Sequence, residues 1–157
     1  MNRKFNIVLA VSFLSVFSLL ESAGSDQDST ISQDSLKEDR TRHVKDVLET
    51  VKGKEKLPAE DVFKDIQTMK GRSVERLLAI MEYGYSRSLG VSCDHCHNTH
   101  MWESSEKKEK QIARQMSQMM RTINAELLKN IQGLKSETPA VNCSTCHRGQ
   151  VKPALDF

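Results

Sequence analysis

Two short segments of the chain carry the same arrangement of cysteine and histidine. They are Cys93-Asp94-His95-Cys96-His97 and Cys143-Ser144-Thr145-Cys146-His147, and together they contain all four cysteines of the protein. Two intervening residues place a pair of thiols at a spacing that suits the two vinyl groups of haem, and the following histidine can offer an imidazole nitrogen to the iron. The pattern predicts two covalently bound c-type haems, attached at these cysteines, with His97 and His147 as iron ligands.

Paired cysteines also occur in zinc sites and in redox-active dithiols. A tetrahedral four-cysteine zinc site does not require a histidine after each pair. A thioredoxin-like dithiol is expected beside a strand–helix–strand unit, and the sequence shows no such unit. Both alternatives remain less favoured than haem attachment.

The residue on the second face of each iron decides what the haem can do. A second strong ligand closes the iron and favours electron transfer, and a methionine opposite histidine raises the reduction potential. Met81 precedes Cys93 by twelve residues on an apolar helical stripe, and Met116, Met119 and Met120 precede the second motif on another helix. Methionines on such stripes are often adaptable core residues, but here the haem has to lie against the same faces.

Three further histidines are weaker candidates for the iron. His95 lies inside the first motif and His100 lies three residues after His97, so we expect both at the surface. His43 lies on an early helix and is a remote alternative as a distal ligand. We therefore expect methionine, rather than a second histidine, on the distal side of each iron.

The elements that must position these residues are expected to be helices. Helical spacing of apolar residues, with glycines near the ends, predicts helices over about 36–51, 58–71, 73–90 and 104–131. No segment shows the sustained alternation of apolar and polar residues that indicates a strand. The expected fold is all-α and loop-rich, with a helix–loop–CxxCH unit that occurs twice.

The beginning of the chain predicts export. Residues 1–25 combine two early positive charges, an apolar run and a small-residue cleavage site, which is typical of a secretory signal peptide. Residues 26–35 are polar and are expected to form a flexible tether, which leaves 36–157 as a dihaem cytochrome c domain. We expect a periplasmic protein, membrane-associated if the N-terminal segment is not cleaved, and without a lipid anchor because no cysteine lies near the cleavage site.

The net charge and the low aromatic content of the chain bear on its partners and cofactors. The formal net charge is +2 and no basic patch alternates with aromatic residues, which argues against nucleic-acid binding. Only five aromatic residues lie beyond the signal segment, so the core is poor in the side chains that usually fill it. Two haem groups would supply the missing apolar surface.

Several stretches resemble one known family, the cytochrome c subunit of photosynthetic reaction centres and its shorter relatives. The resembling stretches are 62–67, 88–97, 113–124 and 141–150. The resemblance implies a helix that supplies the distal methionine, then a tight turn, then CxxCH, and it assigns Met81 to the first haem. For the second haem it implies Met119, with Met116 and Met120 as alternatives. Reaction-centre subunits hold four haems and many carry a lipid-anchoring cysteine, so this chain resembles one half of such a subunit.

These features favour a one-electron carrier, rather than an enzyme, that exchanges electrons with donor and acceptor proteins. A dihaem peroxidase or a haem-based gas sensor is the alternative, and either would need one iron with an open position. The chain is net positive from residue 104 onward and net negative between residues 26 and 103. We therefore hypothesise that the part carrying the second motif docks an acidic redox partner.

Overall fold

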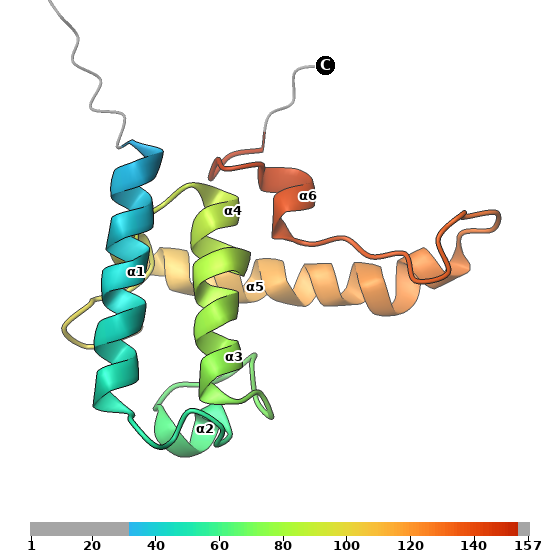
Figure 1. The fold of residues 1–157 in the computed structure, drawn as a ribbon. Coiled ribbons are helices and arrows are strands. Elements are labelled where there is room, and N and C mark those ends of the chain that lie inside the picture. Colours follow the sequence, from blue (N-terminus) through green and yellow to red (C-terminus); the bar gives the residue numbers. More distant parts are fainter. Residues whose placement is uncertain (1–31, 154–157) are drawn as a thin grey trace, which may run out of the picture. The chain divides into compact units, whose positions relative to one another are not determined.

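Helices and loops make up residues 32–153, which the computed structural model describes (Figure 1). Within this range the extended pairing is limited to two isolated β-bridges, Pro58 with Ser73 and Asn98 with Met101. The all-α, loop-rich fold predicted from the sequence is confirmed. No helix between residues 32 and 153 is long and apolar enough to cross a membrane. The expected signal segment, 1–25, lies outside the described residues.

Helix α1 spans Gln33–Thr50 and begins three residues before the expected start. The Ser32 hydroxyl accepts a hydrogen bond from the Ser35 amide at 3.1 Å, which caps the first turn. The buried side of the helix carries Leu36, Arg40 and Val47. The last residues of the expected tether, 33–35, are therefore helical.

Helix α2 is much shorter than the sequence suggested. It spans Ala59–Val62, and Phe63 is already extended, so the helix expected to continue to residue 71 was wrong beyond Val62. Asp65 adopts a left-handed conformation with φ of 63°, which no regular helix allows. Lys110 and Arg114, more than forty residues away in sequence, hold its carboxylate in place. A tertiary contact overrides the local helical pattern here.

The helix that leads into the first motif has three consecutive parts. Helix α3 spans Val74–Ala79, the π-helical segment η1 spans Ile80–Ser86, and α4 spans Arg87–Leu89. Gly90 ends the helix with φ of 66°, a conformation that glycine adopts without steric cost. Met81 lies inside the π-helical segment, a wider helix form that often occurs at functional sites. The short 3₁₀ segment η2, Cys93–His95, follows directly.

The second long helix begins later than expected and is irregular at its end. Helix α5 spans Lys108–Thr122, a π-helical segment η3 spans Ile123–Leu127, and a 3₁₀ segment η4 spans Leu128–Asn130. Helix α6, Cys143–His147, is the second motif itself. Each motif is thus preceded by a helix with a π-helical stretch, which extends the weak internal repeat seen in the sequence.

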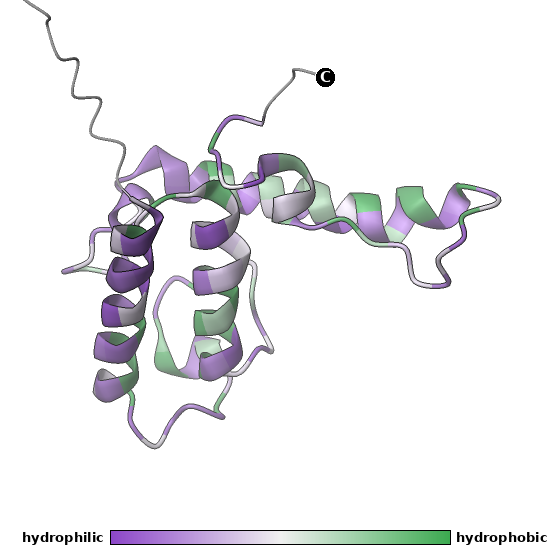
Figure 2. Ribbon diagram, turned by 45° about the horizontal axis from the view of Figure 1, so that its top comes forward, coloured by the Kyte–Doolittle hydropathy of each residue, from purple (hydrophilic) through white to green (hydrophobic). Residues whose placement is uncertain are grey.

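The apolar core lies between α1 and α3. Val47 of α1 and Val51, which follows its last residue, pack with Val74 and Leu78 of α3. Phe63 and Trp102 lie against this cluster. Beyond residue 78, no apolar side chain in the described part of the chain is fully buried. Six of the ten exposed large apolar side chains in the described part of the chain lie on α5 and the segments that follow it: Ile112, Met116, Met119, Leu127, Ile131 and Leu134. The green bands on α5 in Figure 2 mark its hydrophobic residues.

Candidate functional site

The first motif opens onto a mostly apolar cavity. Cys93, Cys96 and His97 line it together with Met81. Its apolar walls come from α1, from the α3–η1–α4 helix and from the loop after α2; they include Val47, Phe63, Leu77, Leu78, Leu89 and Val91. The structure therefore brings together the four residues that the sequence assigns to the first haem. Met69 lines the same cavity.

Helix α1 holds the first motif in place through Asp39. One carboxylate oxygen of Asp39 accepts a hydrogen bond from the Cys93 amide at 3.1 Å. The other oxygen lies 2.8 Å from Arg42 and 3.3 Å from the Nε2 atom of His43. His43 also lines the cavity, so the structure places this remote alternative near the first motif. Sequence reasoning did not reveal this positioning role of Asp39.

Trp102 is a second residue whose position the sequence did not reveal. Its ring lies 5.3 Å from the ring of His97 and 5.6 Å from that of His43, measured between centroids. The His43 and Trp102 rings meet edge to face, a favoured aromatic geometry. Trp102 thus restricts the orientation of the His97 imidazole.

The titration behaviour of the first motif suits a neutral histidine ligand and bound thiols. Burial lowers the pKa of His97 to about 4, so its imidazole is neutral at physiological pH, as a metal ligand requires. Burial, together with the nearby Asp39 charge, raises the pKa of the Cys93 thiol to about 11. Burial also raises the pKa of Cys96. Redox-active dithiols need a lowered thiol pKa, so the dithiol alternative is disfavoured.

The second motif is held by its own cap and by a backbone contact. The Asn142 side chain accepts a hydrogen bond from the Thr145 amide at 3.1 Å and begins α6. The Nδ1 atom of His147 lies 3.0 Å from the Gln150 carbonyl oxygen. A hydrogen bond from this nitrogen fixes the ring and leaves Nε2 for a metal. Cys143 is half-buried and Cys146 is exposed.

Asn124 ties the second motif to the end of the long helix. Its amide nitrogen donates to the Val141 carbonyl at 2.9 Å, and its amide oxygen accepts from the Val141 N–H at 2.8 Å. Val141 lies two residues before Cys143. Asn124 lies in a stretch that the family resemblance covers, but the sequence did not reveal this role.

The methionines proposed for the second motif lie on α5. Met116 is 38% exposed and Met119 is 48% exposed, whereas Met120 is half-buried. Met119 does not line the cavity that contains Met81. Its pairing with His147 therefore stays a prediction. The exposed methionines nevertheless belong to an apolar surface on α5 that a second bound group could cover.

The described part of the chain contains no cluster of side chains that would support the zinc alternative. Between residues 32 and 153, no group of three or more histidine, cysteine, aspartate or glutamate side chains is arranged to hold a metal ion. The two cysteine pairs thus do not form a common tetrahedral site. A ligand set of one histidine and one thioether, as found in c-type cytochromes, fits the residues around the first cavity.

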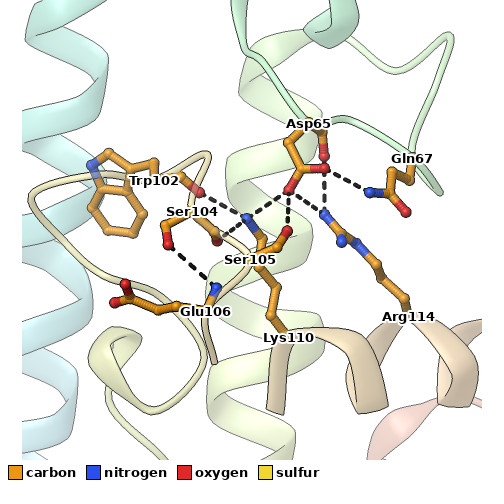
Figure 3. Close-up of polar contacts among 8 residues, drawn as sticks. All are labelled: Asp65, Gln67, Trp102, Ser104, Ser105, Glu106, Lys110 and Arg114. Atoms are coloured by element: carbon orange, nitrogen blue, oxygen red, sulfur yellow. Dashed lines mark hydrogen bonds and ion pairs between the residues drawn. The ribbon is translucent and has the colours of Figure 1, made fainter. Parts of the chain in front are cut away.

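A charged network lies at the wall of the first cavity (Figure 3). The Asp65 carboxylate accepts hydrogen bonds from Lys110 at 2.9 Å, from Arg114 at 2.6 Å and from the Ser105 hydroxyl at 3.0 Å. Lys110 also donates to the carbonyl oxygens of Trp102 and Ser104, at 2.9 and 2.8 Å. Burial alone would raise the pKa of Asp65, but the bonds from Lys110 and Arg114 outweigh it and hold the pKa well below its usual range.

Comparison with known proteins agrees with this picture. The family model for the photosynthetic reaction centre cytochrome c subunit matches residues 24–155. Cytochrome c-554 of Chloroflexus aurantiacus is 34% identical over 83 residues, which cover 53% of this chain and 20% of that protein. The photosynthetic reaction center cytochrome c subunit of Rubrivivax gelatinosus is 29% identical over 92 residues, covering 52% of this chain and 25% of its own length.

A further subunit of the same name comes from Thermochromatium tepidum. It is 30% identical over 98 residues, which cover 60% of this chain and 22% of the relative. The chain thus spans about a quarter or less of the length of these three relatives. The family model, in contrast, covers most of the chain, including both CxxCH motifs. On this basis the chain belongs to the photosynthetic reaction centre cytochrome c subunit family.

Proposed function

We propose that this protein is a dihaem c-type cytochrome that carries single electrons between redox partner proteins. The observation that carries the proposal is the shared cavity of Cys93, Cys96, His97 and Met81. It places two thiols, an imidazole and a thioether around one apolar space, which is the donor set of a haem attached by thioethers and ligated by histidine and methionine. Membership of a cytochrome c family supports the same assignment.

The residues of the first motif have separate tasks. Cys93 and Cys96 attach the cofactor, and His97 is neutral and restrained by Trp102 for ligation. Met81 would supply a second protein ligand and would keep other ligands away from the iron. The haem supplies reversible one-electron chemistry at iron. If His97 and Met81 both bound the iron, the site would favour electron transfer over binding of peroxide or gases.

The second motif is proposed to bind a second haem at Cys143 and Cys146, with His147 as its ligand. The hydrogen bond between His147 and Gln150 supports this role because it would orient the ring. The apolar surface of α5 supports it as well, since Ile112 and Met119 are about half exposed without a cover among the described residues. Met119 is proposed as the distal ligand, with Met116 and Met120 as alternatives.

Localisation and partners follow from the sequence and the family. The proposed signal peptide, 1–25, would direct the protein to the periplasm, and the relatives named as reaction center subunits support an association with a membrane complex. We propose donor and acceptor proteins as its partners. No small-molecule substrate is part of the proposal, and catalysis is not expected.

Optical spectroscopy of the purified full chain tests the proposal. A pyridine haemochrome assay is expected to give two covalent haems per chain, and the oxidised protein should show the charge-transfer band of methionine-ligated iron. Met81→Ala should remove the part of this band that comes from the first haem. Met119→Ala should remove the part that comes from the second haem. Met69→Ala is the matched control, because Met69 lines the same cavity without an assigned ligand role.

Carbon monoxide binding and peroxide turnover by the same purified protein separate the competing functions. Carbon monoxide binding by the reduced wild-type protein, with peroxide turnover, would favour a dihaem peroxidase, and binding without turnover would favour a gas sensor. Chains without covalent haem would refute the proposal altogether.

A further inference from the structure

Arg114 lines the first cavity, and one of its guanidinium nitrogens lacks a hydrogen-bond partner among the described residues. The side chain of Arg114 is 13% exposed, and its Nη2 atom donates to the Asp65 carboxylate at 2.6 Å and to the Asp65 carbonyl at 3.1 Å. Its Nη1 atom is buried and has no hydrogen-bond partner among residues 32–153. Buried charged donors are rarely left unpaired, because the loss of hydration is not compensated. A hydrogen-bond acceptor for the Nη1 atom of Arg114 is therefore expected.

The charges around this nitrogen are also unbalanced. Lys110 and Arg114 are two cations that share one acidic partner, Asp65. Glu82 and Glu103 line the same cavity, but no hydrogen bond or ion pair joins either of them to these cations. Glu103 instead lies 3.8 Å from Lys64. The network thus keeps an excess positive charge next to an apolar cavity, where an added carboxylate would be stabilised.

We propose that Arg114, supported by Lys110, binds a propionate carboxylate of the haem attached at Cys93 and Cys96; this inference rests on the proposed function. Haem carries its two propionates on the edge opposite the vinyl groups that the cysteines bind. Asp65, Lys110 and Arg114 form one charged part of the wall of a cavity that is mainly apolar, and Lys64, Glu82 and Glu103 also line this cavity. Asp65 is a positioning residue, because its carboxylate and its carbonyl oxygen hold the Nη2 atom of Arg114.

A second buried guanidinium nitrogen without a hydrogen-bond partner does not support a propionate site in the same way. The Nη1 atom of Arg40 is also buried without a partner in the described part of the chain. Arg40, however, does not line the cavity of the first motif. The assignment is therefore restricted to Arg114 and Lys110, which do.

The proposal predicts a change in reduction potential confined to one haem. A cation beside a haem stabilises the reduced, more electron-rich state, so loss of the cation lowers the potential. In Arg114→Gln the potential of the first haem should fall, and that of the second should stay near its wild-type value. The first haem is identified as the one whose methionine band disappears in Met81→Ala. The propionate bending band in the resonance Raman spectrum should shift as well.

Arg121 offers a matched control on the same helix. Its Nη1 atom donates to the Thr68 carbonyl at 2.7 Å, so it also bonds the loop after α2, but it is exposed and does not line the cavity. Arg121→Gln should leave both potentials and the propionate band unchanged. The inference is overturned if Arg114→Gln behaves like Arg121→Gln, or if it shifts both haems equally.

A conservative variant covers the case in which Arg114→Gln does not fold. Arg114→Lys keeps the charge but loses the planar fork that binds a carboxylate through two nitrogens. It should shift the propionate band while the potential of the first haem stays near the wild-type value; an unchanged band refutes the inference. Wild-type protein without covalent haem would refute the proposed function instead, so the two failures are distinguishable.

Discussion

The Gly149 amide donates a hydrogen bond to the Ser88 carbonyl oxygen at 2.8 Å. Gly149 lies two residues after His147, and Ser88 lies in α4, just before the first motif. The bond therefore joins the end of the second CxxCH unit to the helix that delivers the first. Gly90 lies at the same junction, and a Cβ atom there would clash with the Gly149 carbonyl oxygen. The two motifs are thus held together by backbone contacts that leave no room for a side chain at Gly90.

Gly90→Ala is expected to destabilise the protein by at least about 2 kcal/mol. A left-handed alanine costs about 1–2 kcal/mol, and the clash with the Gly149 backbone adds to this because backbone cannot move aside cheaply. Gly133→Ala is the control, since Gly133 has φ of 77° but nothing within 4 Å of the added Cβ. Denaturant unfolding of both holoproteins gives the comparison. Equal losses of stability would mean that the junction does not constrain the fold.

Asn124→Ala should release the loop that leads into the second motif. The change removes two hydrogen bonds to the Val141 backbone, with an expected cost of about 1–2 kcal/mol. Asn124→Asp keeps the hydrogen-bond acceptor and loses the donor. Its free energy of unfolding should therefore lie between those of Asn124→Ala and the wild type. Asn130→Ala removes one exposed bond, to the Glu126 carbonyl, and should have little effect. Limited proteolysis between residues 131 and 141 should be faster only in the Asn124 variants.

Asp65→Asn is expected to cost about 3 kcal/mol at neutral pH, because it removes the carboxylate that Lys110 and Arg114, two mostly buried cations, share. The pKa of Asp65 is lowered in the folded state. Its contribution to the free energy of unfolding is therefore fully present above the unfolded pKa of about 4 and is lost as the pH falls toward the folded value.

The pH dependence separates this role from a simple packing effect. The wild-type and Asp65→Asn stabilities should converge as the pH falls below about 4. Asp61→Asn serves as the control, since Asp61 is exposed on α2 and takes part in no ion pair within the described residues. A constant difference between wild type and Asp65→Asn at all pH values would contradict the electrostatic account.

Most of the helices, and the grouping of the first motif with Met81 around one cavity, could be predicted because their signals are local. The helical stripe through Val74, Leu77, Leu78 and Met81 led to the helix before the first motif, and the CxxCH spacing led to Cys93, Cys96 and His97. Met81 could be added because it lies on the same face as the apolar residues that line the cavity. Each of these inferences needed only residues within about twenty positions of one another.

The parts that could not be predicted depend on distant contacts. The pattern over residues 58–71 suggested a helix, but the left-handed Asp65 exists because Lys110 and Arg114 bind its carboxylate. A π-helical turn also cannot be recognised from the spacing of residues in the sequence, because it shifts the apolar face of the helix without any change in residue type. The contacts of Asp39 with Cys93 and of Asn124 with Val141 join separate elements, so no single segment reveals them.

Reversal of surface charge after residue 104 tests where redox partners dock. Lys129, Lys135 and Lys152 are exposed in the net positive part of the chain. If this part docks an acidic donor, changing all three lysines to glutamate should slow the second-order rate of reduction by that donor about tenfold or more at low salt. Lys45→Glu on α1 is the control, because Lys45 is exposed in the net negative part. For the wild type the rate should fall as salt is added, since screening weakens the attraction between the partners. A salt-independent rate, or an equal loss in the Lys45 variant, would place the docking surface elsewhere.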